Sequence, residues 1–441
     1  MPGSFLHGTI RVLSARIGSL LLGVGISVIL ARFLGPEGKG LYSLAMLLPT
    51  MIVALINLGV GPSTVYHVAR KEFSAGEAFG SNLGLAVVIG TVGMGIGAIA
   101  VSGFSSRILP GVPQIYLYGV LLLVPLQLAY TYLLFVFHGI QDFRCYSWIT
   151  LLHSALGLAL SLVVLVVFKR GVAGALLAAG SASLGAVLVQ LFIVRRTWRV
   201  SFGISREYAK KILSYGWKAH LANIVRFLNY RIDMLLVNGY LGATAVGLYS
   251  VGVGLVEKLW LIPNAASTVL YPRISAETDE DKRKRLTPLV TRTTLWLTAV
   301  AAAVLVALCR PIIVFLYSDA YVGSVQAAQA LLIGIVAMAA SKPLANDLAG
   351  RGRPMLNTYI SLVTLLTNVV LNLILIPRFA IIGAAWASTA SYSATFFVRL
   401  VVYCRISRGS WTTVVLPQRR DVWMLVSGLK RAAKAAAGRM R

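Results

Sequence analysis

The chain has 441 residues, of which 58% are hydrophobic and only 12% are charged. In a soluble domain about half of the residues are apolar and about a quarter are charged, so this composition excludes an ordinary soluble protein and indicates a membrane protein. The formal net charge is +27, but no nucleic-acid recognition motif accompanies it, and no nucleic-acid partner is expected. The three cysteines lie far apart without metal-ligand spacing, so neither a disulfide framework nor a metal site is predicted.

Twelve long apolar segments follow one another along the chain. A transmembrane helix needs roughly 20 mostly apolar residues to cross about 30 Å of hydrocarbon. The segments cover about 11–33, 41–66, 78–106, 108–141, 145–168, 171–194, 215–240, 246–271, 290–318, 320–341, 354–377 and 379–398. A membrane β-barrel would show shorter, alternating segments, so the predicted fold class is an all-α polytopic membrane protein with about twelve transmembrane helices. The first segment is too long for a signal-peptide core and is expected to be retained.

Basic residues concentrate in alternate connections. Lysine and arginine crowd the connections 195–211, 281–285 and 350–354 and the tail, whereas 239–246 and 318–324 contain none. An excess of basic residues marks the cytoplasmic side, so both termini are predicted to be cytoplasmic, which requires an even number of spans. The basic end of the tail, 419–441, reads either as an interfacial helix on anionic membrane lipids or as a solvated segment.

A short glycine-rich sequence occurs twice. LGPEGKGLYS (34–43) returns as LGATAVGLYS (241–250), each time between the first and second span of a six-span block, and VAGA (172–175) resembles IIGA (381–384). Such self-similarity predicts two pseudo-symmetric six-helix lobes in parallel orientation, the arrangement of secondary transporters that hold substrate between lobes and rock one against the other. The predicted domains are an N-terminal lobe (1–200), a cytoplasmic linker (201–214), a C-terminal lobe (215–405) and a basic tail (406–441).

Several stretches resemble one known family in the expected order. They are ILARFLGPEGKGLYSLAM, NLGVGPSTVYHVAR, FLNYRIDMLLVNGYLGATAVGLYSVG, LYPRIS, FLYSDAYVGSVQAAQALL and IPRFAIIGAAWASTASY. The chain resembles the bacterial polysaccharide (oligosaccharide) flippases of the multidrug/oligosaccharidyl-lipid/polysaccharide exporter superfamily. The resemblance implies V-shaped lobes around a central cavity and a multi-pass protein of the bacterial cytoplasmic (inner) membrane. It also implies movement of undecaprenyl-pyrophosphate-linked oligosaccharide from the inner to the outer leaflet, with glycosyltransferases and a polymerase of the same pathway as partners.

Polar residues form a stripe on the seventh span. At 100° per residue, Asn223, Arg226, Tyr230 and Asp233 lie within about an 80° sector. A planar guanidinium suits phosphate, so Arg226 is predicted to bind the pyrophosphate together with Arg16 of the first span, the pseudo-equivalent helix. Asn223 and Tyr230 are predicted to bind sugar hydroxyls. The alternative is that Arg226 and Asp233 form a structural pair, and for Asp233 the structural role is favoured.

The eighth and tenth spans also carry charges. Glu257 and Lys258 are candidates for coupling to a proton or a sodium ion, or for pairing with the charges of the seventh span. Pro263 is expected to bend the eighth span because it removes a backbone hydrogen bond. Lys342 and Asp347, near the inner end of the tenth span, are expected to snorkel or to line the inner mouth.

Three other functions are weighed against the flippase. A multidrug antiporter needs an acidic cavity for organic cations, whereas the intramembrane charges here lean basic. A lipid II-type exporter of the same superfamily usually has fourteen spans, two more than predicted here. A membrane polysaccharide polymerase would need a sizeable outer loop or domain, and no nucleophile–base arrangement appears. The protein is therefore predicted to have no catalytic residues and no cofactor, the coupling ion being left open.

Overall fold

The computed structural model describes residues 2–200, 203–277 and 279–418, and in this part of the chain every regular element is helical. The predicted interfacial helix at 419–441 lies outside the described residues. The helices are α1 (Pro2–Ile56), α2 (Val60–Ala69), α3 (Ala75–Ile108), α4 (Gln114–Leu121), α5 (Leu123–Gly139), α6 (Phe143–Leu162), α7 (Gly171–Thr197), α8 (Arg206–Val256), α9 (Leu261–Ala276), α10 (Glu280–Tyr317), α11 (Ser324–Gly350), α12 (Pro354–Ser407) and α13 (Trp411–Val415), with short turns η1 (Val163–Val167), η2 (Glu257–Trp260) and η3 (Asp319–Tyr321).

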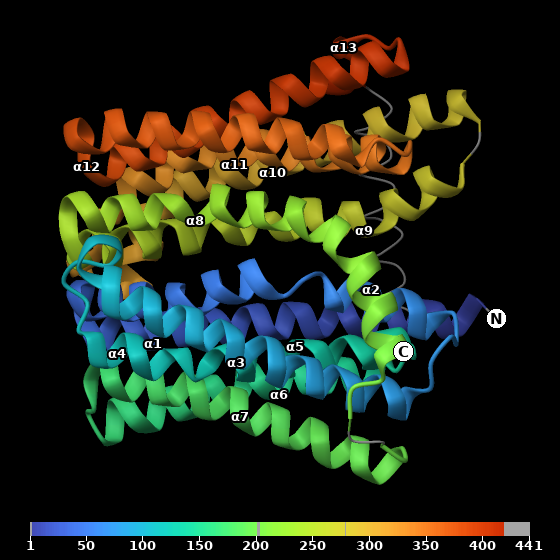
Figure 1. Cartoon of the computed structure of the whole chain (residues 1–441). Coiled ribbons are helices and arrows are strands. Elements are labelled where there is room, and N and C mark those ends of the chain that lie inside the picture. Colours follow the sequence, from blue (N-terminus) through green and yellow to red (C-terminus); the bar gives the residue numbers. More distant parts are fainter. Residues whose placement is uncertain (1, 201–202, 278, 419–441) are drawn as a thin grey trace, which may run out of the picture. The chain divides into compact units, whose positions relative to one another are not determined.

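Nine spans of the described chain are long and apolar enough to cross a membrane. Three of them, those of α1, α8 and α12, have 45, 45 and 54 residues, about twice what one crossing needs. Each contains one break in the helical backbone, at Gly35, Gly242 and Ala380 respectively. The chain reverses in these places (Figure 1), so six single spans and three double ones give twelve segments of membrane length in the described part. The predicted all-α polytopic fold with about twelve transmembrane helices is confirmed.

The repeated sequence has a repeated backbone conformation. Gly35 and Gly242, the same position of the two LG…GLYS copies, have φ values of 67° and 78°. Gly171 (φ 58°) and Ala380 (φ 50°) likewise occupy corresponding positions before the sixth and twelfth spans. A left-handed backbone costs an ordinary L-residue roughly 1–2 kcal/mol, which explains why three of these four positions are glycine.

Contacts divide the chain into two compact units. Among the described residues, the first unit contains those up to Gly252 with 312–324 and 376–381, and the second contains 253–311, 325–375 and 382–418. The contacts therefore group α8, up to Gly252, with the N-terminal helices. The lobe boundaries expected from the repeat (1–200 and 215–405) remain a prediction.

The first unit is built from helices that run side by side, α1 against α6, α3 against α5 and α6 against α7 (Figure 1). Its core contains a buried polar group, Asn82 of α3, whose Nδ2 donates to the Tyr132 carbonyl at 3.0 Å. Asn82 Oδ1 accepts a hydrogen bond from the Tyr208 hydroxyl at 2.9 Å. Because buried polar groups are costly unless they are paired, this asparagine fixes α3, α5 and the start of α8 against one another.

A charged cluster holds the start of α8 against the end of α2. The carboxylate of Glu72 lies 2.8 Å from His67 Nδ1, 3.2 Å from Arg70 Nε and 3.9 Å from Lys211 Nζ. The hydrogen bond with His67 is the largest cause that lowers the pKa of Glu72, and the nearby cations lower it further. This cluster lies outside the spans and ties the linker region to the first unit.

The second unit buries charges that were expected at its inner mouth. Asp347 is fully buried on α11, where it accepts a hydrogen bond from Thr287 of α10 at 2.7 Å and pairs with Arg351 Nε at 2.5 Å. The guanidinium of Arg351 also pairs with Glu280 at 2.6 Å. The expectation that Asp347 lines the mouth was wrong, because tertiary pairing between α10 and α11 compensates the burial of its charge.

Candidate functional site

The polar stripe of α8 brings two predicted residues into contact. Arg226 is exposed and Asn223 is half-buried, and Arg226 Nη2 donates to Asn223 Oδ1 at 2.6 Å. Residues three apart are neighbours on a helix surface, which accounts for the pair. Tyr230, half-buried, follows one turn later. Only one of the five N–H groups of the guanidinium is engaged by Asn223, so the arginine is oriented while donors remain for an oxyanion.

Asp233 lies deeper on the same helix and has a structural environment. Its side chain is 3% exposed, and Oδ2 accepts a hydrogen bond from the Tyr249 hydroxyl at 2.6 Å. Tyr249 is the tyrosine of the second LG…GLYS copy, on the other leg of the α8 hairpin. The carboxylate therefore ties the two legs together across the turn at Gly242.

Arg16 lies on the exposed surface of α1, within electrostatic range of His138 on α5. The structure does not test whether Arg16 and Arg226 act together on one substrate, so their joint action remains a prediction. His138 was not a predicted site residue, and rings of Phe143 and Tyr146 lie beside it at 5.8 and 5.4 Å. Sequence spacing could not reveal this neighbourhood because α1 and α5 are distant along the chain.

A second cationic group lies in the second unit, around a break between α8 and α9. Lys342 Nζ of α11 donates to Asn264 Oδ1 at 2.9 Å and lies 4.6 Å from the centre of the Trp260 ring. Trp260 ends η2, a 3-10 turn that interrupts the α-helical pattern just before Pro263. A 3-10 stretch inside a span often marks a hinge, and Pro263 cannot donate to the preceding turn. The 3-10 turn lies beside the predicted bend, which remains a prediction, and Lys342 contacts this turn.

The coupling candidates Glu257 and Lys258 both lie in this 3-10 turn. Glu257 is half-buried and Lys258 is exposed. An ionisable residue inside a span is costly unless it pairs or faces a cavity, so their place at the break makes both candidates for a moving element.

Comparing the two repeats shows why Lys342 is distinctive. In the first repeat the Tyr132 hydroxyl of α5 donates to the backbone carbonyl of Asn57 at 2.9 Å. In the second repeat Lys342 donates to the side chain of Asn264, the residue that corresponds to Asn57. Lys342 and Tyr132 are 210 residues apart, close to the 207-residue offset of Asn57 and Asn264, so the two repeats use different side chains, a cation and a neutral phenol, near corresponding places. Aligning the two halves at that offset would place Lys342 opposite Phe135, so the sequence alone does not reveal the exchange.

The described residues contain no cluster of three or more histidine, cysteine, aspartate or glutamate side chains that could hold a metal ion. Around α8 and at the α9 break, cations instead pair with amides, Arg226 with Asn223 and Lys342 with Asn264. Such groups bind anions and hydroxyls.

Comparisons with known proteins bear directly on the family. The family model described as "Polysaccharide biosynthesis protein" matches residues 29–326, more than half of the chain. The chain belongs to this family. The family resemblance inferred from the sequence is therefore confirmed.

Two curated relatives and one solved structure give further detail. The "Probable flippase AglR" of Haloferax volcanii is 28% identical over 183 residues, which are 40% of this chain and 38% of that protein. The "Succinoglycan biosynthesis transport protein ExoT" of Rhizobium meliloti is 26% identical over 318 residues, 70% of this chain and 62% of that protein. The matches thus span less than two thirds of either relative. The structure titled "Lipid II flippase MurJ, inward closed conformation" shares the fold, with a TM-score of 0.74 and 16% identity, over 95% of this chain and 96% of that one.

Proposed function

We propose that the protein is a flippase, not an enzyme, that moves undecaprenyl-pyrophosphate-linked oligosaccharide from the inner to the outer leaflet of the bacterial cytoplasmic membrane during polysaccharide biosynthesis. The observation that carries the proposal is that a member of a polysaccharide-biosynthesis family presents cations within its apolar spans, Arg226 on α8 and Lys342 on α11. Ionisable residues inside spans are costly and mark substrate pathways. An anionic, hydroxyl-rich substrate matches both the cations and the amides beside them.

In this proposal the predicted residues have separate tasks. Arg226, held by Asn223, offers a planar fork to the pyrophosphate, and this orientation before binding reduces the entropy lost when the substrate is bound. Asn223 and Tyr230 serve sugar hydroxyls, and Arg16 contributes a second positive charge from α1. Glu257 and Lys258 in η2 are the proposed residues for coupling to a proton or a sodium ion. Asp233 instead has the structural role of joining the two legs of the α8 hairpin.

Alternating access would use the two repeated turns. Within the first unit the copies meet, because a Cβ atom at Gly40 would overlap the Ala243 carbonyl, and one at Gly247 would overlap the Pro36 carbonyl. The hydroxyl oxygens of Ser43 and Ser250 lie 3.4 Å apart, 207 residues apart in sequence. This reciprocal contact lies at the predicted outer end of the spans. We propose that it closes the outer side in the present conformation and separates when the protein opens outward.

A multidrug exporter of the same superfamily is the runner-up. Export of organic cations would require acidic groups for the substrate, and the buried carboxylates of the two units, Asp233 and Asp347, are already engaged by Tyr249 and by Thr287 and Arg351. Among the candidate intramembrane charges that are accessible, the basic Arg226, Lys258 and Lys342 outnumber the acidic Glu257, which favours the anionic substrate.

The proposal is tested by charge removal in a flippase-null bacterial strain. We expect Arg226→Gln and Lys342→Gln each to abolish polymer export and to cause accumulation of lipid-linked oligosaccharide, while the protein still inserts into the membrane. Arg226→Lys, which keeps the charge and loses the fork, should retain partial export. Arg206→Gln, an exposed arginine at the start of the same helix, is the matched control. Normal export by both loss-of-charge variants would refute the proposed substrate site.

A further inference from the structure

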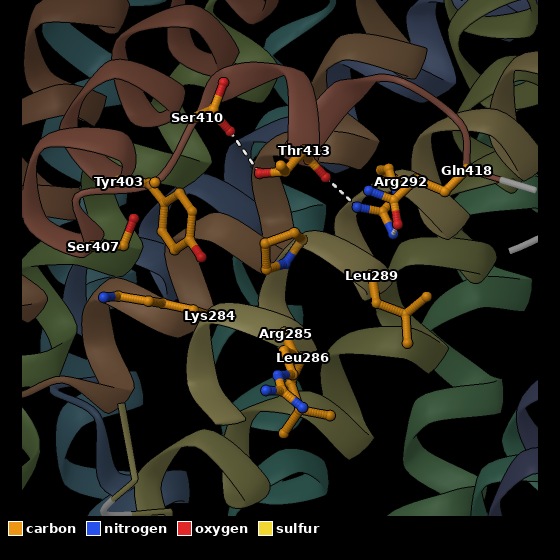
Figure 2. Close-up of a pocket in the computed structure, with 12 residues that line it drawn as sticks. Lys284, Arg285, Leu286, Leu289, Arg292, Tyr403, Ser407, Ser410, Thr413 and Gln418 are labelled. Atoms are coloured by element: carbon orange, nitrogen blue, oxygen red, sulfur yellow. Dashed lines mark hydrogen bonds between the residues drawn. The ribbon is translucent and has the colours of Figure 1, made fainter. Parts of the chain in front are cut away.

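A cavity of about 490 Å³ lies at one end of the second unit, between the start of α10, the end of α12 and α13 (Figure 2). Three basic residues and several hydroxyls line it, and none of the described residues that line it is acidic. The lining residues are Lys284, Arg285, Leu286, Pro288, Leu289, Arg292, Tyr403, Ser407, Gly409, Ser410, Thr413 and Gln418.

The cavity wall is held by specific hydrogen bonds. Arg292 is only 5% exposed, and its guanidinium donates to the Thr413 carbonyl and to Gln418 Oε1. Figure 2 shows Arg292 directed at Thr413 on one side of the cavity, with Lys284 below Tyr403 on the other. The indole N–H of Trp296 donates to the Val415 carbonyl at 2.9 Å. These bonds fix α13 against α10, so the cavity is a built feature of the unit and not a gap beside a loose segment.

The remaining two cations are available to a ligand. Lys284 is half-buried and Arg285 is exposed, and among the described residues no carboxylate lies within ion-pair distance of either. Nearby Glu280 is already paired with Arg351 and Arg283. The buried Ser407 hydroxyl lies near that of Tyr403, but it completes no hydrogen bond of standard geometry with a described residue. Two uncompensated cations and an unsatisfied hydroxyl together suit a phosphate group.

The position of the cavity indicates where that phosphate comes from. The cavity lies at the ends of α10 and α12 that border the basic connection 281–285, the predicted cytoplasmic side. Trp296 and Trp411 are 43% and 57% exposed beside it, and tryptophans gather at the membrane–water interface. An apolar groove of about 460 Å³, lined by Phe397, Leu400, Val401, Cys404, Arg405 and Trp411, flanks the same α12–α13 corner.

We propose that this cavity binds the phosphate headgroup of an anionic phospholipid of the inner leaflet, with an acyl chain along the neighbouring apolar groove. Lys284 and Arg285 contact the phosphate, and Ser407 and Ser410 supply hydroxyls. The lipid fastens α13, and with it the beginning of the basic tail, at the membrane surface. This site is independent of the proposed transport substrate, whose candidate residues lie elsewhere on α1, α8 and α11.

The test measures lipid binding to the full-length protein in detergent. Native mass spectrometry and thermal unfolding are recorded with phosphatidylglycerol, with zwitterionic phosphatidylcholine, and with inorganic phosphate or pyrophosphate. Lys284→Gln/Arg285→Gln is compared with Arg206→Gln/Lys210→Gln, which removes one lysine and one arginine from an exposed face of α8. If the double variant does not fold, Lys284→Gln alone is used.

We expect phosphatidylglycerol to bind the wild type and the α8 control (Arg206→Gln/Lys210→Gln) and to raise the Tm of both. It should bind the pocket variant (Lys284→Gln/Arg285→Gln) about 30-fold more weakly, because each basic side chain near an anionic headgroup contributes about a factor of five. Equal binding to the pocket variant and the control would overturn the site. Stabilisation by inorganic phosphate or pyrophosphate equal to that by phosphatidylglycerol would overturn the lipid as its source. Transport by the same variants is measured in a separate assay, so that failure of the lipid site and failure of the flippase proposal can be distinguished.

Discussion

The reciprocal contact of the two repeated turns predicts an unusual cost for adding one methyl group. In Gly40→Ala the new Cβ would overlap the Ala243 oxygen and lie 2.6 Å from its carbonyl carbon. Carbon atoms in contact prefer roughly 3.5–4.0 Å, so the two turns would have to separate by about 1 Å. The obstacle is backbone, which cannot rotate away as a side chain can.

The expected size of the effect follows from comparing two glycines. Overpacking a well-packed contact costs typically ~1–3 kcal/mol, whereas Gly→Ala in an unhindered helix stabilises by about 0.5–1 kcal/mol. Gly239 of α8 has no neighbouring atom within 4 Å of the position that a methyl group would occupy, and it is the matched control. We therefore expect Gly40→Ala and Gly247→Ala to be less stable than Gly239→Ala by roughly 2–3 kcal/mol in this conformation.

The assay is cross-linking of Ser43→Cys with Ser250→Cys in a background without the three native cysteines. The serine oxygens are 3.4 Å apart, close enough for a disulfide after a small adjustment. The cross-link should form readily, stop transport and be reversed by reductant, and adding Gly40→Ala should slow its formation. If Gly40→Ala and Gly239→Ala have the same cross-linking rate, the same stability and the same transport activity, the two turns do not make this tight contact.

Three further predictions concern single charged residues. Asp233→Ala should lower the Tm, because it leaves the buried Tyr249 hydroxyl without its acceptor at a cost of about 1–3 kcal/mol. Asp233→Asn should keep most of the export activity. Loss of export by a stably folded Asp233→Asn would instead indicate that Asp233 takes part in ion coupling. Lys342→Met should leave insertion and Tm nearly unchanged while transport is lost, and full transport would remove Lys342 from the site. Because the pKa of Glu72 is lowered in the folded protein, its contribution to stability is present above its ordinary value of 4.5 and is lost as the pH falls through the lowered value. The Tm difference between wild type and Glu72→Gln should therefore be present at pH 7 and disappear in strong acid, and a difference that persists there would contradict the assigned role.

The sequence could predict what depends on local pattern. Apolar segments of membrane length predicted the twelve crossings, and the LG…GLYS repeat located the breaks at Gly35 and Gly242, because a rapid reversal needs a left-handed backbone that glycine adopts without strain. The helical period also placed Asn223 beside Arg226.

Contacts between distant elements could not be predicted in this way. The burial of Asp347 depends on Thr287 and Arg351 from other turns and helices, and the environment of Lys342 depends on a break between α8 and α9. Neither the spacing of residues nor their hydropathy contains this information.

The most direct test of the flippase proposal uses the purified protein in liposomes that contain a fluorescent undecaprenyl-pyrophosphate-linked oligosaccharide. Its headgroup is first restricted to one leaflet, and its appearance in the other is followed with a membrane-impermeant pyrophosphatase. The proposal predicts transfer by the wild type well above protein-free vesicles and near-background transfer by Arg226→Gln. Background transfer by a correctly folded wild type, under every ion gradient tried, would contradict it.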